Sequence, residues 1–300
     1  MSSTRAFLSP LFIFALFSPT VNAEAWLPLF ADEAIAKGYV LPEPFGLSIG
    51  AMHVEQGIEV DSIGFGGLNH PFFPNRPLAP DAIDISAEHG EQQSQVYTLR
   101  ADAWLLPFLN VYAIAGKMTG YTETKVHVNK VQLIPGRPPI TQGLPSFDFR
   151  LDLDGYLYGG GIVIAGGVGN WFTLIDASLT NTRLTVIDGN INAFVLSPRI
   201  GYDFSDKGLP LRLWVGGMYQ EVEQELSGKI SDLDLGPAGN ELIKLVDSNG
   251  EARFDVEQHL TTPWNTLVGF QYLISNDWSL VGEVGLGGRQ SGMLSLEYRF

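Results

Sequence analysis

Six charged residues lie in segments that otherwise consist mainly of apolar and small residues. They comprise three arginines and three carboxylates: Arg100, Asp102, Arg212, Glu283, Glu297 and Arg299. If they share an interior, opposite charges must pair there, because an unpaired buried charge costs several kcal/mol. Two kinds of chemistry are then open. The charges can neutralise one another in a filled interior, or they can act as the selectivity element of a narrow pore.

The remaining composition excludes several other kinds of site. The chain has no cysteine, so neither disulfides nor thiolate metal sites are available. Its net charge of −15 opposes binding to nucleic acid, whose phosphates are also negative. The acidic stretches lack the D-x-D-x-D-G spacing of a calcium loop. We therefore expect no metal, no cofactor and no nucleic-acid partner.

The charged residues belong to segments in which apolar and polar residues alternate. Between 97 and 105, apolar or aromatic residues occupy the odd positions, whereas Arg100 and Asp102 occupy even ones. The segments 211–220 and 278–286 show the same period of two, which is typical of a strand with two different faces. Beyond residue 23, no apolar run approaches the roughly 20 residues of a transmembrane helix. The pattern predicts an all-β chain that spans a membrane as a barrel, with a lipid face and a lumen face.

The N-terminal segment predicts export. Arg5 precedes an apolar run from Ala6 to Phe17, and Val21-Asn22-Ala23 follows as a cleavage site. We predict a signal peptide at 1–23, a periplasmic leader at 24–44 and one barrel domain at 45–300. Residues 32–38 of the leader suit a short helix, which either plugs the periplasmic mouth or belongs to a flexible leader.

Turn signals between the alternating segments fall into a short and a long class. Short turns are expected at 107–108, 169–170, 205–210 and 275–277, with tight connections at 188–189 and 288–289. Longer polar stretches occupy 57–92, 123–146 and 227–254. Short periplasmic turns and long extracellular loops are typical of an antiparallel up-and-down barrel. About ten strands are predicted, with eight or twelve as alternatives, at 46–56, 93–106, 109–122, 148–168, 171–184, 190–204, 211–226, 255–274, 278–288 and 291–300.

The strand predicted at 148–168 is longer than a bilayer requires. Roughly 9 to 11 residues cross the apolar core. Phe149, Leu151 and Leu153 alternate with charged residues in its first half, and the pattern blurs through the glycines at 159–161. We expect a bulge or kink there, with the first half standing above the bilayer.

The last ten residues carry the most specific signal. Leu294, Leu296, Tyr298 and Phe300 fall on one face of the final strand. This ending resembles the closing strand of Gram-negative outer-membrane β-barrels, which commonly end in phenylalanine with tyrosine two residues earlier. The resemblance implies an outer-membrane location, contact with membrane lipid and lipopolysaccharide, and recognition by the barrel-assembly machinery. The alternative, a soluble β-sandwich, would not explain the asymmetry of the loops.

A barrel of about ten strands is far narrower than the porins of 16 to 18 strands that leave an aqueous channel. We therefore predict a structural or narrow-pore transport role, with no ligand specified. One alternative is surface binding or adhesion through the long loops.

The other alternative is an outer-membrane enzyme acting on lipid or peptide. The five histidines are scattered, at 53, 70, 89, 127 and 259. A barrel such as outer-membrane phospholipase A needs a serine and a histidine close together, and an omptin-like protease needs paired acids with a histidine. Asp152 and Asp154 with His127 or His259 could imitate the second arrangement, but no omptin-type motif surrounds them. Catalysis is therefore the less favoured prediction.

Overall fold

The computed structural model describes residues 27–79, 81–134, 136–233 and 240–300, apart from 242, 245 and 248. The predicted signal peptide at 1–23 lies outside these residues. The barrel wall consists of β1 (Phe45–Gly66), β5 (Gly90–Leu106), β6 (Leu109–Val131), β7 (Ser146–Val168), β8 (Trp171–Leu184), β9 (Asp188–Asp203), β10 (Leu211–Lys229), β12 (Trp264–Leu273), β13 (Trp278–Leu286) and β14 (Arg289–Arg299). Smaller elements are α1 (Ala31–Ala36), β2 (Asn69–His70), β3 (Phe73–Pro77), β4 (Ile83–Ala87), β11 (Arg253–Leu260), and the 3-10 turns η1 (Ser205–Lys207) and η2 (Ile230–Asp232). Among the described residues, no helix is long and apolar enough to cross a bilayer.

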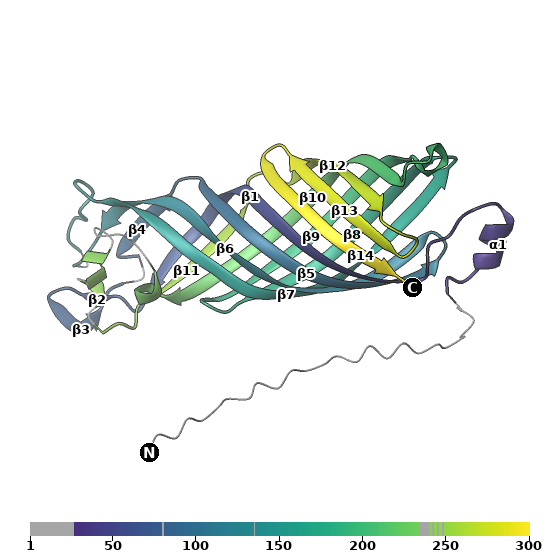
Figure 1. The fold of residues 1–300 in the computed structure, drawn as a ribbon. Coiled ribbons are helices and arrows are strands. Elements are labelled where there is room, and N and C mark those ends of the chain that lie inside the picture. The colour runs from purple at the N-terminus through teal and green to yellow at the C-terminus, as the bar shows by residue number, and fades with distance from the viewer. Residues whose placement is uncertain are drawn as a thin grey trace, which may run out of the picture.

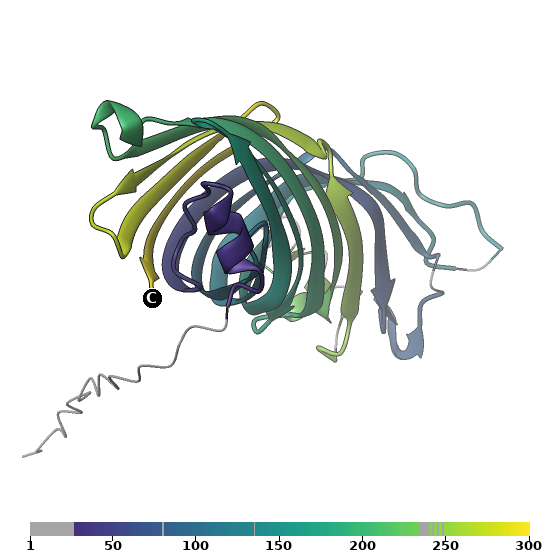
Figure 2. The same cartoon turned by 90° about the vertical axis from the view of Figure 1, so that its right-hand side faces the viewer.

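The ten wall strands pair antiparallel with their neighbours and close into a ring. Each pairs with the next wall strand along the chain, from β5 to β14. β1 pairs with β5 on one side and with β14 on the other, in register from Gly46 opposite Arg299 to Gln56 opposite Arg289. Figure 1 shows the tilted strands, and Figure 2 looks into one end of the ring. The predicted ten-stranded up-and-down barrel is confirmed.

The outward face of the wall carries an apolar band between two sets of aromatic side chains. The exposed apolar residues of the band include Ile49, Leu99, Ile164, Ile200, Val215, Val268 and Leu294. Near the short turns lie Phe108, Trp171, Tyr272, Trp278 and Phe300, and toward the other end lie Tyr97, Tyr156, Tyr158 and Trp264. Aromatic girdles of this kind sit at the two interfaces of a bilayer.

Beyond the second girdle, several strands continue away from the short turns and reverse their hydrophobic faces. In β7, Phe149, Leu151 and Leu153 are buried inside, whereas Arg150 and Asp152 face out. The predicted length of this strand is therefore confirmed. The structure has no bulge at the glycines 159–161, because the pairing of β7 with β6 and with β8 runs through them without a register shift.

The extension owes its stability to an apolar core of its own. Side chains from β1, β6, β7, β10 and β11 pack together inside it, among them Ile58, Val126, Leu151, Leu226 and Phe254. β11 pairs with both β1 and β10, and so closes the wall above the short β13–β14 hairpin. We call this part, at the left of Figure 1, the outer extension.

In the outer extension, several predicted boundaries between strands and loops are wrong. Residues 57–66, 123–131 and 227–229 are strand rather than loop, because polar residues mark only their outward face while their inward face is apolar. The tight connection lies at 185–187 rather than at 188–189. The strand predicted at 255–274 is divided into β11 and β12 by residues 261–263. Pro263 has no N–H to donate to a ladder, which explains the interruption.

The leader forms the helix α1 at the end of the barrel that carries the short turns. Figure 2 shows this helix in front of the barrel opening. The preceding segment is attached to the wall, since Leu29 N donates to Leu105 O at 2.9 Å and the Leu27 side chain is buried. Phe30 and Ile35 are exposed, whereas Ala34 of the helix is buried.

Candidate functional site

The six charged residues singled out in the sequence all alternate with outward-facing apolar neighbours and point into the barrel. The alternation of β5 places Arg100 and Asp102 inside while Leu99 is exposed. The same alternation places Arg212 of β10, Glu283 of β13, and Glu297 and Arg299 of β14 inside. They lie in three separate groups of contacts.

The first group joins Arg299 to Asp102 near the end of the barrel where the chain reaches Phe300. Arg299 Nη2 donates to Asp102 Oδ2 at 2.9 Å, and Asn110 Nδ2 donates to the same oxygen at 2.7 Å. Arg100 Nη2 reaches Asn110 Oδ1 at 3.4 Å. One carboxylate thus serves two donors, and the amide of Asn110 links it to a second arginine.

Arg100 has a second set of partners on β6 and β8. Its guanidinium lies over the ring of Tyr112, 3.7 Å from the centroid, and its Nη1 is 4.0 Å from Asp176 Oδ2. The Tyr112 hydroxyl donates to Asp176 Oδ1 at 2.8 Å. Stacking and pairing together fix this guanidinium across the lumen.

The second group surrounds Glu283. Arg199 of β9 donates through Nε at 2.7 Å and through Nη2 at 3.0 Å, one bond to each carboxylate oxygen. Trp214 Nε1 adds a third bond at 2.8 Å. Only 6% of the Glu283 side chain and 13% of the Arg199 side chain are exposed. A bidentate pair of this kind is both strong and geometrically specific.

The third group connects Arg212 to Glu297 through an amide. Arg212 Nε donates to Asp203 at 2.6 Å, and its Nη1 donates to Gln271 at 3.0 Å. Gln271 Nε2 and Ser279 Oγ then donate to Glu297 Oε2 at 3.3 and 3.1 Å. Among the described residues, Glu297 therefore accepts hydrogen bonds only from neutral groups.

Sequence reasoning missed the partners that complete these groups, above all Asp176, Arg199 and Asp203. Each lies at an inward position of β8 or β9. The sequence did contain a signal for two of them. Asp176 and Arg199 are charged residues at inward positions of strands whose outward residues are mainly apolar. What the sequence did not show is which strands face each other across the lumen.

Toward the outer extension, neutral amides replace the charges. Gln92 Oε1 accepts from Gln56 at 3.0 Å and from Gln224 at 3.1 Å, and Gln224 Oε1 accepts from Gln258 at 2.8 Å. These four glutamines come from β1, β5, β10 and β11. Their ladder of bonds spans the interior where the apolar core begins.

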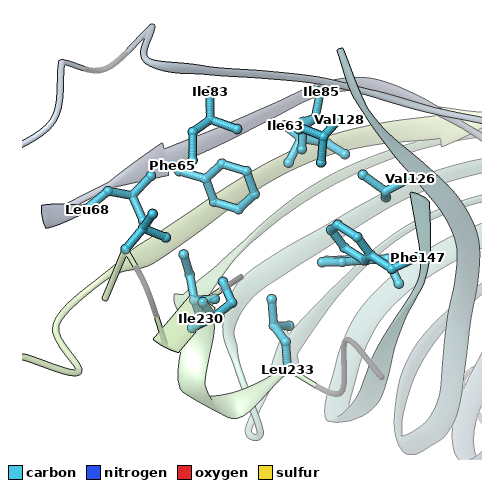
Figure 3. Close-up of a pocket in the computed structure, with 13 residues that line it drawn as sticks. Ile63, Phe65, Leu68, Ile83, Ile85, Val126, Val128, Phe147, Ile230 and Leu233 are labelled. Atoms are coloured by element: carbon cyan, nitrogen blue, oxygen red, sulfur yellow. The ribbon is translucent and has the colours of Figure 1, made fainter. Parts of the chain in front are cut away.

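The apolar core ends in a chamber shown in Figure 3. All its lining residues are apolar: Ile63, Phe65, Leu68, Ile83, Ile85, Val126, Val128, Phe147, Phe149, Ile230, Leu233, Ile243 and Val246. A register shift in β1 between Val60 and Ser62 turns Ile63 and Phe65 inward. The free volume is only about 20 Å³. The described side chains therefore pack closely in this part of the interior.

The histidines lie apart from the acidic pair named in the sequence. His127 Nε2 is 2.7 Å from Glu88, and His259 Nδ1 is 2.8 Å from Asp61. The pKa of Glu88 lies below its usual range, because the hydrogen bond with His127 favours the carboxylate. Asp152 instead contacts Arg150, and Asp154 contacts Lys117. In the described ranges, no group of three potential ligands is arranged to hold a metal ion.

Comparison with known proteins gives no family model and no curated protein that matches this chain. Similar solved structures include the outer-membrane protein OprG of Pseudomonas aeruginosa, at 8% identity and a TM-score of 0.37, with 87% of this chain and 99% of that one covered. The COG4313 outer-membrane channel of Pseudomonas putida F1 has 8% identity and a TM-score of 0.35, covering 86% and 96%. Omp33 of Acinetobacter baumannii has 12% identity and a TM-score of 0.26, covering 87% and 99%. The barrel assignment rests on the strand pairing of this chain itself.

Proposed function

We propose that this protein resides in a bacterial outer membrane, to which the signal at 1–23 exports it. The apolar band between two aromatic girdles supports this location, because such a surface is stable only against lipid. Membrane lipid and lipopolysaccharide are then its surroundings. The outward face of the closing segment, with Leu294 in β14 and Phe300 directly after it, is our candidate for the signal that the barrel-assembly machinery recognises.

We further propose narrow-pore transport of small solutes. The observation that carries this proposal is the charged lining of the lumen, where Arg100, Asp102, Arg199 and Glu283 are held in hydrogen-bonded groups. A barrel serving only as a scaffold can fill its interior with apolar side chains, as the outer extension does. A ring of ten strands leaves a narrow lumen, so we expect passage of small solutes only.

Conductance of the purified protein in a planar bilayer tests this proposal, with Arg100→Ala and Glu297→Ala as matched variants of opposite charge. We expect small, discrete conductance steps from the natural protein. Loss of a lumen cation should shift the ion preference toward cations, and loss of the carboxylate should shift it toward anions. The reversal potential in a salt gradient measures both shifts.

If neither the natural protein nor the two variants shows any conductance, the transport proposal is contradicted. The second candidate function, surface binding by the loops, would then take its place. One observation favours it: Phe72 and Phe73 are exposed at the β2–β3 hairpin of the outer extension, 77% and 60% respectively. Exposed aromatic side chains of this kind commonly mark contact sites.

A further inference from the structure

Arg289 differs from every other lumen arginine in its partners. It begins β14, faces inward, and is 3% exposed. Arg100, Arg199, Arg212 and Arg299 each have a carboxylate oxygen within 4.0 Å. Arg289 has none among the described residues; its Nη1 donates to the amide oxygen of Gln220, and its Nη2 has no partner.

An unpaired guanidinium in this position is costly. Removing a cation from water carries a penalty of several kcal/mol unless an opposite charge compensates it. Gln220 can accept a hydrogen bond, but its neutral amide cannot balance the charge. The geometry therefore favours a negative group at the free Nη2.

Other unsatisfied polar groups belong to β12, the strand paired with the one that carries Gln220. Asn265 of β12 is 6% exposed, and neither its Nδ2 nor its Oδ1 has a hydrogen-bond partner in the described part of the chain. It lies opposite Met218 on β10, two residues before Gln220, the partner of Arg289. On β14, Ser291 follows Arg289 by two residues and so shares its inward face.

Gly285 of β13 brings Asn265 and Ser291 together. Its register partner on β14 is Ser291. A Cβ on Gly285 would lie 2.5 Å from Asn265 Nδ2 and 2.3 Å from Ser291 Oγ. The Asn265 amide and the Ser291 hydroxyl therefore occupy the space over Gly285 that a Cβ would need, and this glycine lets the two polar groups come close together on the inward face.

We propose that Arg289, Asn265 and Ser291 form a binding site for a small monovalent anion. The guanidinium supplies the balancing charge, and the amide and hydroxyl supply further donors. The single uncompensated charge fits a monovalent ion, and the enclosed position fits a small one. Because Asn265 follows Trp264 of the outer girdle, the site lies at the level of that girdle. It does not depend on whether the barrel conducts.

Bromide is a suitable probe, because its anomalous scattering locates it in crystals of the full-length mature protein. We expect a bromide peak within hydrogen-bond distance of Arg289 Nη2. In solution, the melting temperature should rise with the logarithm of bromide concentration at constant ionic strength, with gluconate as the bulky balancing anion. Arg289→Gln should lose both the peak and the rise, whereas Arg289→Lys should retain part of both.

The control is Arg253→Gln, which removes an exposed arginine of β11 paired with Asp188 and should leave the bromide response intact. If Arg289→Gln does not fold, Asn265→Ala provides the second test and should weaken the bromide response several-fold. An empty lumen in the bromide crystals, or an equal bromide response in the natural protein and in the folded Arg289 or Asn265 variants, would overturn the proposal.

Discussion

At the residue scale, the lumen shows how a barrel accommodates charge in a narrow interior. Glu283 receives two bonds from Arg199 and one from Trp214, so little of its hydrogen-bonding capacity is left unused. Such a pair adds less to stability than its contacts imply, because both ions must first be desolvated. Breaking the pair is nevertheless costly, since it leaves one charge buried alone.

We expect Glu283→Ala to lower the free energy of unfolding by about 3–5 kcal/mol, the cost of a buried charge without its partner. Urea unfolding of the refolded protein in lipid vesicles measures the change. The double variant Arg199→Leu with Glu283→Leu is the control, and should recover much of the loss because no charge remains unpaired. If the double variant is as unstable as the single one, packing rather than charge is responsible.

The Glu88–His127 pair, outside the bilayer, predicts a dependence of stability on pH. Because the folded state lowers the pKa of Glu88, the unfolded chain binds the proton more readily. The contribution of Glu88 is therefore fully present above its unfolded pKa and is lost as the pH falls through its folded pKa. The natural protein should be more stable than Glu88→Gln at neutral pH, and the difference should vanish in acid.

Thermal unfolding of both proteins across the acidic range checks this expectation. His127→Gln serves as the control, since it removes the same hydrogen bond from the other side. A difference between the natural protein and Glu88→Gln that stays constant down to the lowest pH would show that another property of the side chain is involved.

At the element scale, several strands carry two different amphipathic patterns in series. In β10, Leu213 and Val215 face lipid, and farther along, Glu221 and Glu223 occupy the same outward row. The inward row changes in the opposite sense, from Arg212 to Leu226. The alternation with a period of two continues along the whole strand. The exchange of polar and apolar rows therefore follows from the surroundings of the outward face, which are lipid in the first part and water in the second.

The closing strand β14 gives an element-scale prediction. Phe300 exchanges two backbone bonds with Phe45 and stacks on Tyr298, with its ring half exposed. Phe300→Ala should therefore cost only about 1 kcal/mol in the folded barrel, the usual contribution of an aromatic pair. If the strand is an assembly signal, the same change should strongly reduce folded protein in the outer membrane of cells.

Heat-modifiable mobility on gels measures the folded fraction in membranes, and refolding in detergent measures the intrinsic stability. Leu286→Ala is the matched control, because this outward residue of β13 has similar exposure, 54% against 51% for Phe300. Equal losses in cells for both variants would contradict a specific role of the terminal residue.

At the scale of the whole molecule, a membrane-spanning ring continues into an outer extension with a core like that of a soluble protein. The membrane-spanning ring and the outer extension meet near the aromatic residues that lie away from the short turns. There the hydrogen-bonded glutamines separate the charged interior from the apolar one. The apolar chamber of Figure 3 lies in the outer extension. The described part of the extension therefore has an apolar core of its own beyond the membrane-spanning ring.

Cysteine labelling tests the orientation, since the chain contains no cysteine. Asp152→Cys in the outer extension should react with a charged, membrane-impermeant maleimide in intact cells. Asp206→Cys in η1 should react only after the outer membrane is permeabilised. Ile164→Cys, in the apolar band, should react in neither case. Labelling of Asp206→Cys in intact cells would mean that the barrel is inserted the other way.

The sequence by itself determined the ten strands, their antiparallel order and which end carries the short turns. These features depend on local patterns: alternation in the wall strands, turn residues between them, and an apolar outward row from Leu294 to Phe300. It also predicted six charged residues of the lumen. Each of them is a charged side chain on the face of an alternating segment opposite its apolar row.

Only the tertiary structure decided which charges meet. Arg199 and Glu283 are 84 positions apart and come together through closure of the ring, which no local pattern encodes. The outer extension was hidden for a similar reason: its polar outward residues indicate loop, while its core joins side chains from distant strands. The lack of a carboxylate partner for Arg289 among the described residues likewise follows from closure of the ring, which decides which side chains surround it.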